Sequence, residues 1–172
     1  MKRPFFSLSA PFWATLLVLT IVFGGICALP SLARSFSVPS GLFNFGNQTF
    51  VLNHEVLHFL NGFSRSPDGQ HVARLTNRSV NQSMTRAAAI LIDNPSGSGI
   101  FFYVVGAARV KGRESYSSPV FVGDRIKIEA VHVSAEIVTV HYLDHPANVP
   151  LGLPPTKPVT VTYTIQGDGS LH

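Results

Sequence analysis

Short runs of β-branched and aromatic residues, separated by turn residues, fill the second half of the chain. The clearest run is 125–133, in which Ile126, Ile128 and Ala130 alternate with charged residues. Such alternation is typical of a strand with one buried and one exposed face. Comparable runs lie at 87–93, 100–106, 117–122, 137–142 and 159–165. The short connections favour an antiparallel meander, because parallel crossovers need a dozen residues or more. The pattern predicts a mainly β fold, with α+β as the alternative.

The segment 53–63 fits two structures. One face of a helix would bring together four apolar residues: Val56, Phe59, Leu60 and Phe63. Asn53 could cap the start of this helix and Gly62 could end it. A strand and hairpin that turns at Asn61 and Gly62 is the alternative. Of the two, we favour a short helix at the start of the domain.

The first 33 residues have the three parts of a secretory signal. These parts are a basic start, an apolar centre and a small-residue exit: Lys2 and Arg3, residues 12–23, and Ser31 with Ala33. We expect cleavage before Arg34. The alternative is an uncleaved membrane anchor, because residues 11–33 are long enough to cross a bilayer. In both cases the rest of the chain would lie outside the cytoplasm, whether periplasmic, secreted or anchored.

Composition narrows the classes of function. Of the 172 residues, 45% are hydrophobic and only 13% are charged, which argues against disorder. The net charge of +4 falls to +2 without Lys2 and Arg3, which disfavours a nucleic-acid binder. The single cysteine, Cys27, lies in the apolar N-terminal segment, so a disulfide scaffold is excluded. After a linker at 34–46, the remaining length predicts one β-rich domain at 47–168.

One short motif indicates a possible metal site. It is the HExxH string His54-Glu55-Val56-Leu57-His58. On a helix both imidazoles would share a face and bind Zn²⁺, while Glu55 would polarise a metal-bound water for peptide hydrolysis. The extended metalloprotease pattern is absent, because Asn61 and Ser64 stand where it has a glycine and a third histidine. A third ligand would have to come from elsewhere: His71, His132, His141, His145 or Glu129. We favour incidental histidines and expect neither a metal nor a cofactor.

A second group of polar residues accompanies the predicted strands. Asp124 and Arg125 follow a glycine-led turn, and we expect them to pair and orient the start of the next strand. If they are instead exposed beside His132 or His141, they form a candidate binding rim, which also includes His145. In a straight strand, His141 and His145 would lie about 13 Å apart, too far to share one ion.

Several stretches between residues 86 and 165 occur in the order found in a known family. They are Ala88-Ala89-Ile90-Leu91, Ser96-Gly97-Ser98-Gly99, Phe121-Val122-Gly123-Asp124-Arg125-Ile126-Lys127-Ile128-Glu129, His145 and Pro155-Thr156. The chain resembles a family of small bacterial exported domains of unassigned function, and the Gly-Asp-Arg strand is the most specific match. The resemblance implies an envelope-side fold. Two family features are missing, because residues 81–86 replace an acidic loop and the paired cysteines near Leu153 are absent.

These observations predict an exported binding or structural module of the cell envelope. Its expected partner is an envelope protein or a small ligand, with no nucleic acid and with membrane contact only through the N-terminal segment. We expect no catalytic activity. Two other classes are alternatives: a zinc-dependent hydrolase that uses His54, Glu55 and His58, and an envelope inhibitor or chaperone-like protein that binds a partner through an exposed apolar patch.

Overall fold

The computed structural model describes residues 43–97 and 99–172, so the predicted signal or anchor at 1–33 lies outside the described residues. Within the described residues, no helix is long and apolar enough to cross a membrane. Apart from the short 3-10 helix η1 (Phe45–Asn47), all of their regular elements are strands, which confirms the mainly β fold. The strands are β1 (Thr49–Leu52), β2 (Glu55–His58), β3 (Phe63–Arg65), β4 (Val72–Val80), β5 (Arg86–Asn94), β6 (Phe101–Val110), β7 (Arg113–Tyr116), β8 (Val120–Asp124), β9 (Lys127–Ser134), β10 (Ile137–Asp144) and β11 (Lys157–Thr164).

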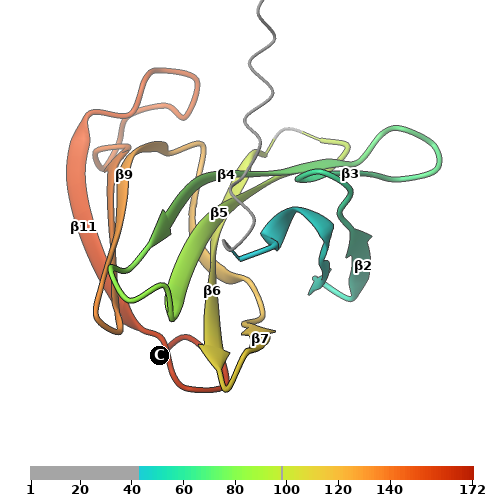
Figure 1. Ribbon diagram of the computed structural model, residues 1–172. Helices are drawn as coiled ribbons and strands as arrows, with labels where there is room; N and C mark the ends of the chain where they lie inside the picture. The colour runs from blue at the N-terminus through green and yellow to red at the C-terminus, as the bar shows by residue number, and fades with distance from the viewer. Residues whose placement is uncertain (1–42, 98) are drawn as a thin grey trace, which may run out of the picture. The chain divides into compact units, whose positions relative to one another are not determined.

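The largest sheet runs through the middle of the domain. Its strands follow the order β3-β4-β5-β6-β7, and β8 pairs with the first part of β6. A second sheet has the order β11-β10-β9 (Figure 1). Every pairing in both sheets is antiparallel. The predicted antiparallel meander is therefore confirmed.

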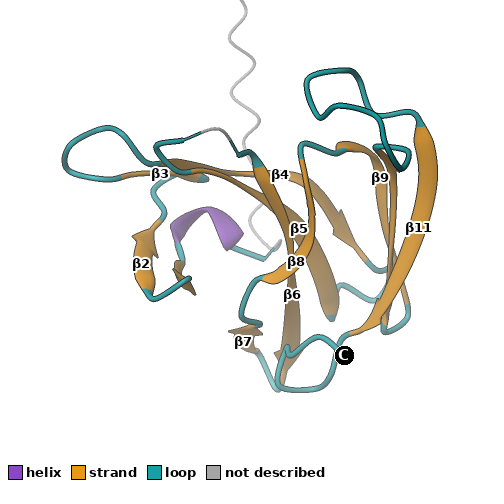
Figure 2. Ribbon diagram, turned by 180° about the vertical axis from the view of Figure 1, so that it is seen from behind, coloured by secondary structure: helices purple, strands orange, loops and turns teal. Residues whose placement is uncertain are grey.

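Strand β5 is buried on both faces, which explains its unbroken apolar sequence. On one face, Leu91 contributes to a core that includes Phe43 and Phe45 near the N-terminal hairpin β1–β2. On the other face, Ile90 contributes to a core that includes Val140 of β10. Figure 2 shows the hairpin on one side of the central sheet and the three-stranded sheet on the other. Burial of each large apolar side chain contributes about 1.5–3 kcal/mol, so two apolar layers stabilise the domain.

The segment that we expected to be a short helix is a hairpin. Strands β1 and β2 pair and leave Asn53 and His54 as a two-residue turn. Both have a positive φ, 49° and 69°, as a type I′ turn requires. The helix prediction is wrong because it groups Val56 and Leu60, which are 52% and 72% exposed, with the buried Phe59. Pairing with β1 orders this segment and buries Leu57 and Phe59 instead.

The turn that we considered at Asn61 and Gly62 is present directly after this hairpin. Leu60 and Phe63 pair across it in both directions, with N···O distances of 2.9 and 3.1 Å. Gly62 has a φ of 83°, a left-handed conformation that suits glycine. Its N–H donates to the carbonyl oxygen of Gly46 at 2.8 Å, so the turn also holds the start of the described chain.

Candidate functional site

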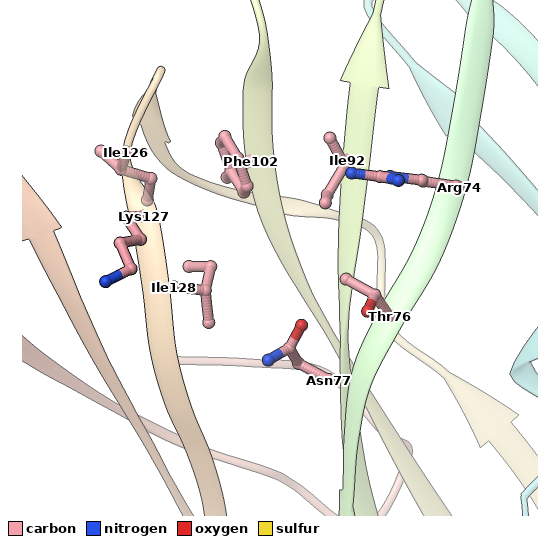
Figure 3. A pocket seen from close by; sticks show the side chains of 8 residues that line it. All are labelled: Arg74, Thr76, Asn77, Ile92, Phe102, Ile126, Lys127 and Ile128. Atoms are coloured by element: carbon pink, nitrogen blue, oxygen red, sulfur yellow. The ribbon is translucent and has the colours of Figure 1, made fainter. Parts of the chain in front are cut away.

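A cleft lies where the two sheets separate. Near one end they are tied together, because the N–H of Val133 on β9 donates to Oγ of Ser79 on β4 at 3.1 Å. Towards the start of both strands the sheets diverge and leave a cleft of about 310 Å³. This volume is at the lower end of the range for small-molecule sites. The lining residues are Arg74, Thr76 and Asn77 of β4, Ile92 of β5, Phe102 of β6, and Ile126, Lys127 and Ile128 at the start of β9 (Figure 3).

The floor of the cleft is apolar. Ile92 and Ile126 are 9% and 5% exposed, and both belong to the core between the sheets. Phe102 and Ile128 pack against the same core and are half-buried. The side chains of Ile92, Phe102 and Ile128 project into the space between β9 and the central sheet (Figure 3). The apolar part of a ligand would therefore replace water over hydrophobic side chains from three strands.

Arg74 supplies a positive charge to this cleft. It pairs with Ile92 in the β4–β5 register, and its guanidinium lies beside Ile92 (Figure 3). Arg74 is exposed, and it forms no ion pair with a carboxylate of residues 43–97 or 99–172. The amino group of Lys127 points away from Arg74 (Figure 3). A guanidinium in this position can bind a carboxylate or phosphate through two parallel hydrogen bonds.

A β-bulge directs Asn77 towards the cleft. The register of β4 against β5 shifts between Thr76 and Ser79, so Asn77 and Arg78 lie opposite the single residue Ala89. Asn77 has a φ of 46°, which is uncommon for a residue other than glycine. Bulges redirect side chains, and strained residues concentrate at functional sites. The side-chain amide of Asn77 points towards Ile128 (Figure 3), where it adds a hydrogen-bonding group to the apolar floor.

Three residues of the predicted binding rim lie at the junction of β8 and β9, next to the cleft. Oδ1 of Asp124 accepts a hydrogen bond from the N–H of Ile100 at 3.1 Å. The N–H of Arg125 donates to the carbonyl oxygen of Ile100 at 2.8 Å. Nε2 of His145 lies 3.2 Å from the carbonyl oxygen of Arg125. The two bonds to Ile100 hold the junction against the start of β6, and the contact of His145 holds it against the end of β10. The cleft residue Ile126 follows directly.

The other two rim residues, His132 and His141, lie on a different surface. Their neighbours Val131 and Val140 face the core between the sheets, so the alternation of strand side chains places both histidines on the outer face. The centres of the two imidazole rings are 6.0 Å apart. The rim that we predicted as one surface is thus divided between the β8–β9 junction and the outer face of the second sheet.

The HExxH residues do not share the helix face that the hydrolase alternative requires. His54 is in the turn of the hairpin, and Nδ1 of His58 lies 3.0 Å from Oγ1 of Thr49. Oε2 of Glu55 is 2.7 Å from Nδ1 of His71. Among the described residues, no group of three His, Cys, Asp or Glu could hold a metal ion. The hydrolase alternative depended on one helix face, and the hairpin removes that face.

Glu55 is instead the exposed member of a charge cluster with His71 and the buried Asp93. Both imidazole nitrogens of His71 contact a carboxylate, Nδ1 that of Glu55 and Nε2 that of Asp93. The side chains of Asp93, His71 and Glu55 are 3%, 13% and 48% exposed. Burial of the imidazole opposes protonation, but its hydrogen bonds to Asp93 and Glu55 and their charges outweigh it, so the pKa of His71 is raised. A charged His71 donates through both nitrogens and retains no lone pair for a metal or a proton.

Sequence reasoning missed the cleft residues and this cluster. Arg74 and Asn77 lie in a stretch without clear alternation, and only the polar interruption at Asn77 and Arg78 indicates a bulge. The sequence pattern marks His71 only as a candidate third zinc ligand. Asp93, a charge at the end of an apolar run, was the available signal for a buried ion pair.

Comparison of the chain with protein-family models, with curated proteins and with solved structures found no match. The resemblance to small exported bacterial domains therefore stays a prediction. The geometry of the cleft and the chemistry of its side chains point to a functional site.

Proposed function

We propose that this domain is a non-catalytic binding module of the cell envelope and that its ligand is a small organic anion with an apolar body. The position of Arg74 is the observation that carries the proposal. Its guanidinium lies beside Ile92 of the apolar floor (Figure 3) and has no ion-pair partner in the described part of the chain. The basic start and apolar centre of residues 1–33 support export.

The cleft combines an apolar floor with the positively charged Arg74, so a ligand that uses both needs an apolar part and an anionic group. An inorganic anion would contact Arg74 but leave the floor of Ile92, Phe102 and Ile128 in water. A neutral hydrocarbon would cover this floor, at about 25 cal/mol per Å² of apolar surface removed from water, but leave the guanidinium unused. A carboxylate on an apolar chain uses both, and Asn77 can donate a second hydrogen bond to it.

The proposal can be tested with three probes: sodium octanoate, octan-1-ol and inorganic phosphate. Each is titrated into the full chain by isothermal titration calorimetry. We expect octanoate to bind more tightly than either of the others. Arg74→Ala should weaken octanoate binding about tenfold, because a hydrogen bond to a charged group contributes about 1.5 kcal/mol or more. It should leave octan-1-ol binding unchanged.

Arg113→Ala is the matched control, because Arg113 on β7 is also exposed and also forms no ion pair within residues 43–97 and 99–172. It should leave the binding of all three probes unchanged. Equal octanoate affinity in the wild type and in Arg74→Ala would refute the proposal. Octan-1-ol binding as tightly as octanoate would refute it as well.

The inhibitor or chaperone-like alternative is a second candidate, favoured by the outer face of the hairpin. Val51 and Val56 lie opposite each other there and are 60% and 52% exposed. This pair gives a partner an apolar contact surface. Val51→Thr with Val56→Thr should abolish capture of an envelope protein that the wild type retains. Retention of the same protein by the double variant would contradict this candidate.

A further inference from the structure

The outer face of the three-stranded sheet carries a histidine pair that the proposed cleft does not use. His132 on β9 lies opposite Thr139 of β10, and His141 follows Thr139 by two residues, so both side chains share one face. Their ring centres are 6.0 Å apart. Two imidazoles bound to one ion at about 2.0–2.1 Å have ring centres within about 6.5 Å of each other. The pair is therefore close enough to share an ion after small side-chain rotations.

A hydrogen bond to Thr160 orients one of these imidazoles. Thr160 of β11 lies opposite His141 of β10, and its Oγ1 is 2.9 Å from Nδ1 of His141. When Nδ1–H donates to this hydroxyl, Nε2 keeps a free lone pair and the ring is held in one orientation. Histidines that bind metals generally have such a partner at their other nitrogen. This contact is independent of the ring spacing and points to the same use.

The available ligands determine which ions can bind here. No third His, Cys, Asp or Glu completes a metal-binding group within residues 43–97 and 99–172, so water would fill the remaining coordination positions. Ca²⁺ and Mg²⁺ prefer oxygen ligands. Imidazole nitrogen suits Zn²⁺, Ni²⁺ and Cu²⁺, and affinity along this series is highest for Cu²⁺. The paired backbones of β9, β10 and β11 hold the two histidines at a constant spacing.

We propose that His132 and His141 bind one divalent transition-metal ion, with Cu²⁺ bound most tightly. His132 is exposed and His141 is half-buried, so an ion reaches the pair from solvent. Two protein ligands leave open positions, which a donor atom from outside the chain can occupy. The site is separate from the cleft, because the register of β9 shifts between Ile128 and Ala130. Ile128 therefore faces the cleft, while His132, next to the core residue Val131, faces the opposite way.

The test is a titration of the full chain, without a histidine tag, with CuCl₂. Calorimetry measures the affinity, and electron paramagnetic resonance counts the nitrogen ligands of the bound Cu²⁺. We expect two imidazole nitrogens in the wild type. His132→Ala and His141→Ala should each raise the Kd at least tenfold, because each removes one of the two protein ligands. Zn²⁺ should bind more weakly than Cu²⁺, and Ca²⁺ should not compete.

Two further variants make the result specific. His54→Ala removes an exposed histidine of the hairpin turn and should leave both the affinity and the nitrogen count unchanged. Thr160→Val removes the orienting hydrogen bond but neither ligand, so it should keep two nitrogens while raising the Kd less than either histidine variant. A double variant, His132→Ala with His141→Ala, that retains the wild-type affinity would overturn the proposal. A two-nitrogen signal that persists in this double variant would also overturn it.

Discussion

Removal of the His71 imidazole should destabilise the domain strongly. In His71→Ala the carboxylate of Asp93, which is 3% exposed, loses its charged partner. Breaking a buried ion pair by removing one member costs about 3–5 kcal/mol, because the other charge stays buried. The second contact, to Glu55, adds less than about 1 kcal/mol, since that side chain is 48% exposed. We therefore expect a loss of about 3 kcal/mol in the free energy of unfolding near pH 6.

This loss should depend on pH in a defined direction. The pKa of His71 is raised in the folded state, so the folded state holds this proton more tightly than the unfolded state. The stabilisation is fully present below the pKa of an unfolded histidine, about 6.5. It is lost as the pH rises through the higher pKa of the folded state. The difference in stability between wild type and His71→Ala should therefore shrink from pH 6 to pH 9.

Urea unfolding followed by circular dichroism over this pH range measures both effects. His132→Ala is the control, because it removes an exposed histidine and should change the free energy of unfolding by less than about 0.5 kcal/mol at every pH. Asp93→Asn should reduce the pH dependence, since it removes the buried charge that favours a protonated His71. A cost for His71→Ala below about 1 kcal/mol at pH 6 would refute the reasoning. So would a difference from wild type that stays constant up to pH 9.

Three other predictions follow from single residues or segments. Oδ1 of Asn81 accepts hydrogen bonds from the N–H groups of Thr85 and Arg86, and its Nδ2 donates to the carbonyl oxygen of Ala135. Asn81→Ala should therefore lower the free energy of unfolding in urea by about 2 kcal/mol. The control Gln82→Ala, at an exposed neighbour, should lower it by less than about 0.5 kcal/mol. Asn77→Gly should relieve the strain of the positive φ, so the melting temperature should stay the same or rise. The same variant should weaken octanoate binding in calorimetry, because it removes the side-chain amide. Unchanged binding would show that Asn77 is not part of the site. A reporter enzyme that works only outside the cytoplasm should be active when it is fused after residue 172, and an inactive fusion would contradict export. Mass spectrometry of the exported protein should find a chain that begins at Arg34.

The strands were the most predictable part of this fold. The alternation of Ile126, Ile128 and Ala130 with charged residues has a period of two and correctly predicts a strand. The register of β9 against β10 shifts beside Ala130, however, so Val131 and Val133 face the core in place of Ala130. The short connections between the runs then restricted the pairing to an antiparallel arrangement. Strand β5 could be recognised as well, although its apolar run carries no period because both of its faces are covered.

The hairpin at residues 49–58 could not be predicted from the local spacing of its apolar residues. The spacing of Val56, Phe59 and Leu60 fits a helix, and only the pairing of β2 with β1 makes Val56 an exposed residue. The left-handed turn at Asn53 was the available local signal, since asparagine adopts this conformation more readily than most residues. Pairing between strands outweighed a weak helical period, because it buries side chains of both segments, such as Phe50 and Leu57, in one core.

By itself, the sequence of this protein determined that the chain forms strands and that no disulfide stabilises the domain. Only the tertiary structure decided which polar side chains meet. His71 reaches Glu55 and Asp93 across 16 and 22 residues. Arg74 comes to lie beside Ile92 in a cleft that opens between the starts of β4 and β9. Such contacts depend on how sheets pack and where a bulge turns one strand, and a period along a single segment carries no information about either.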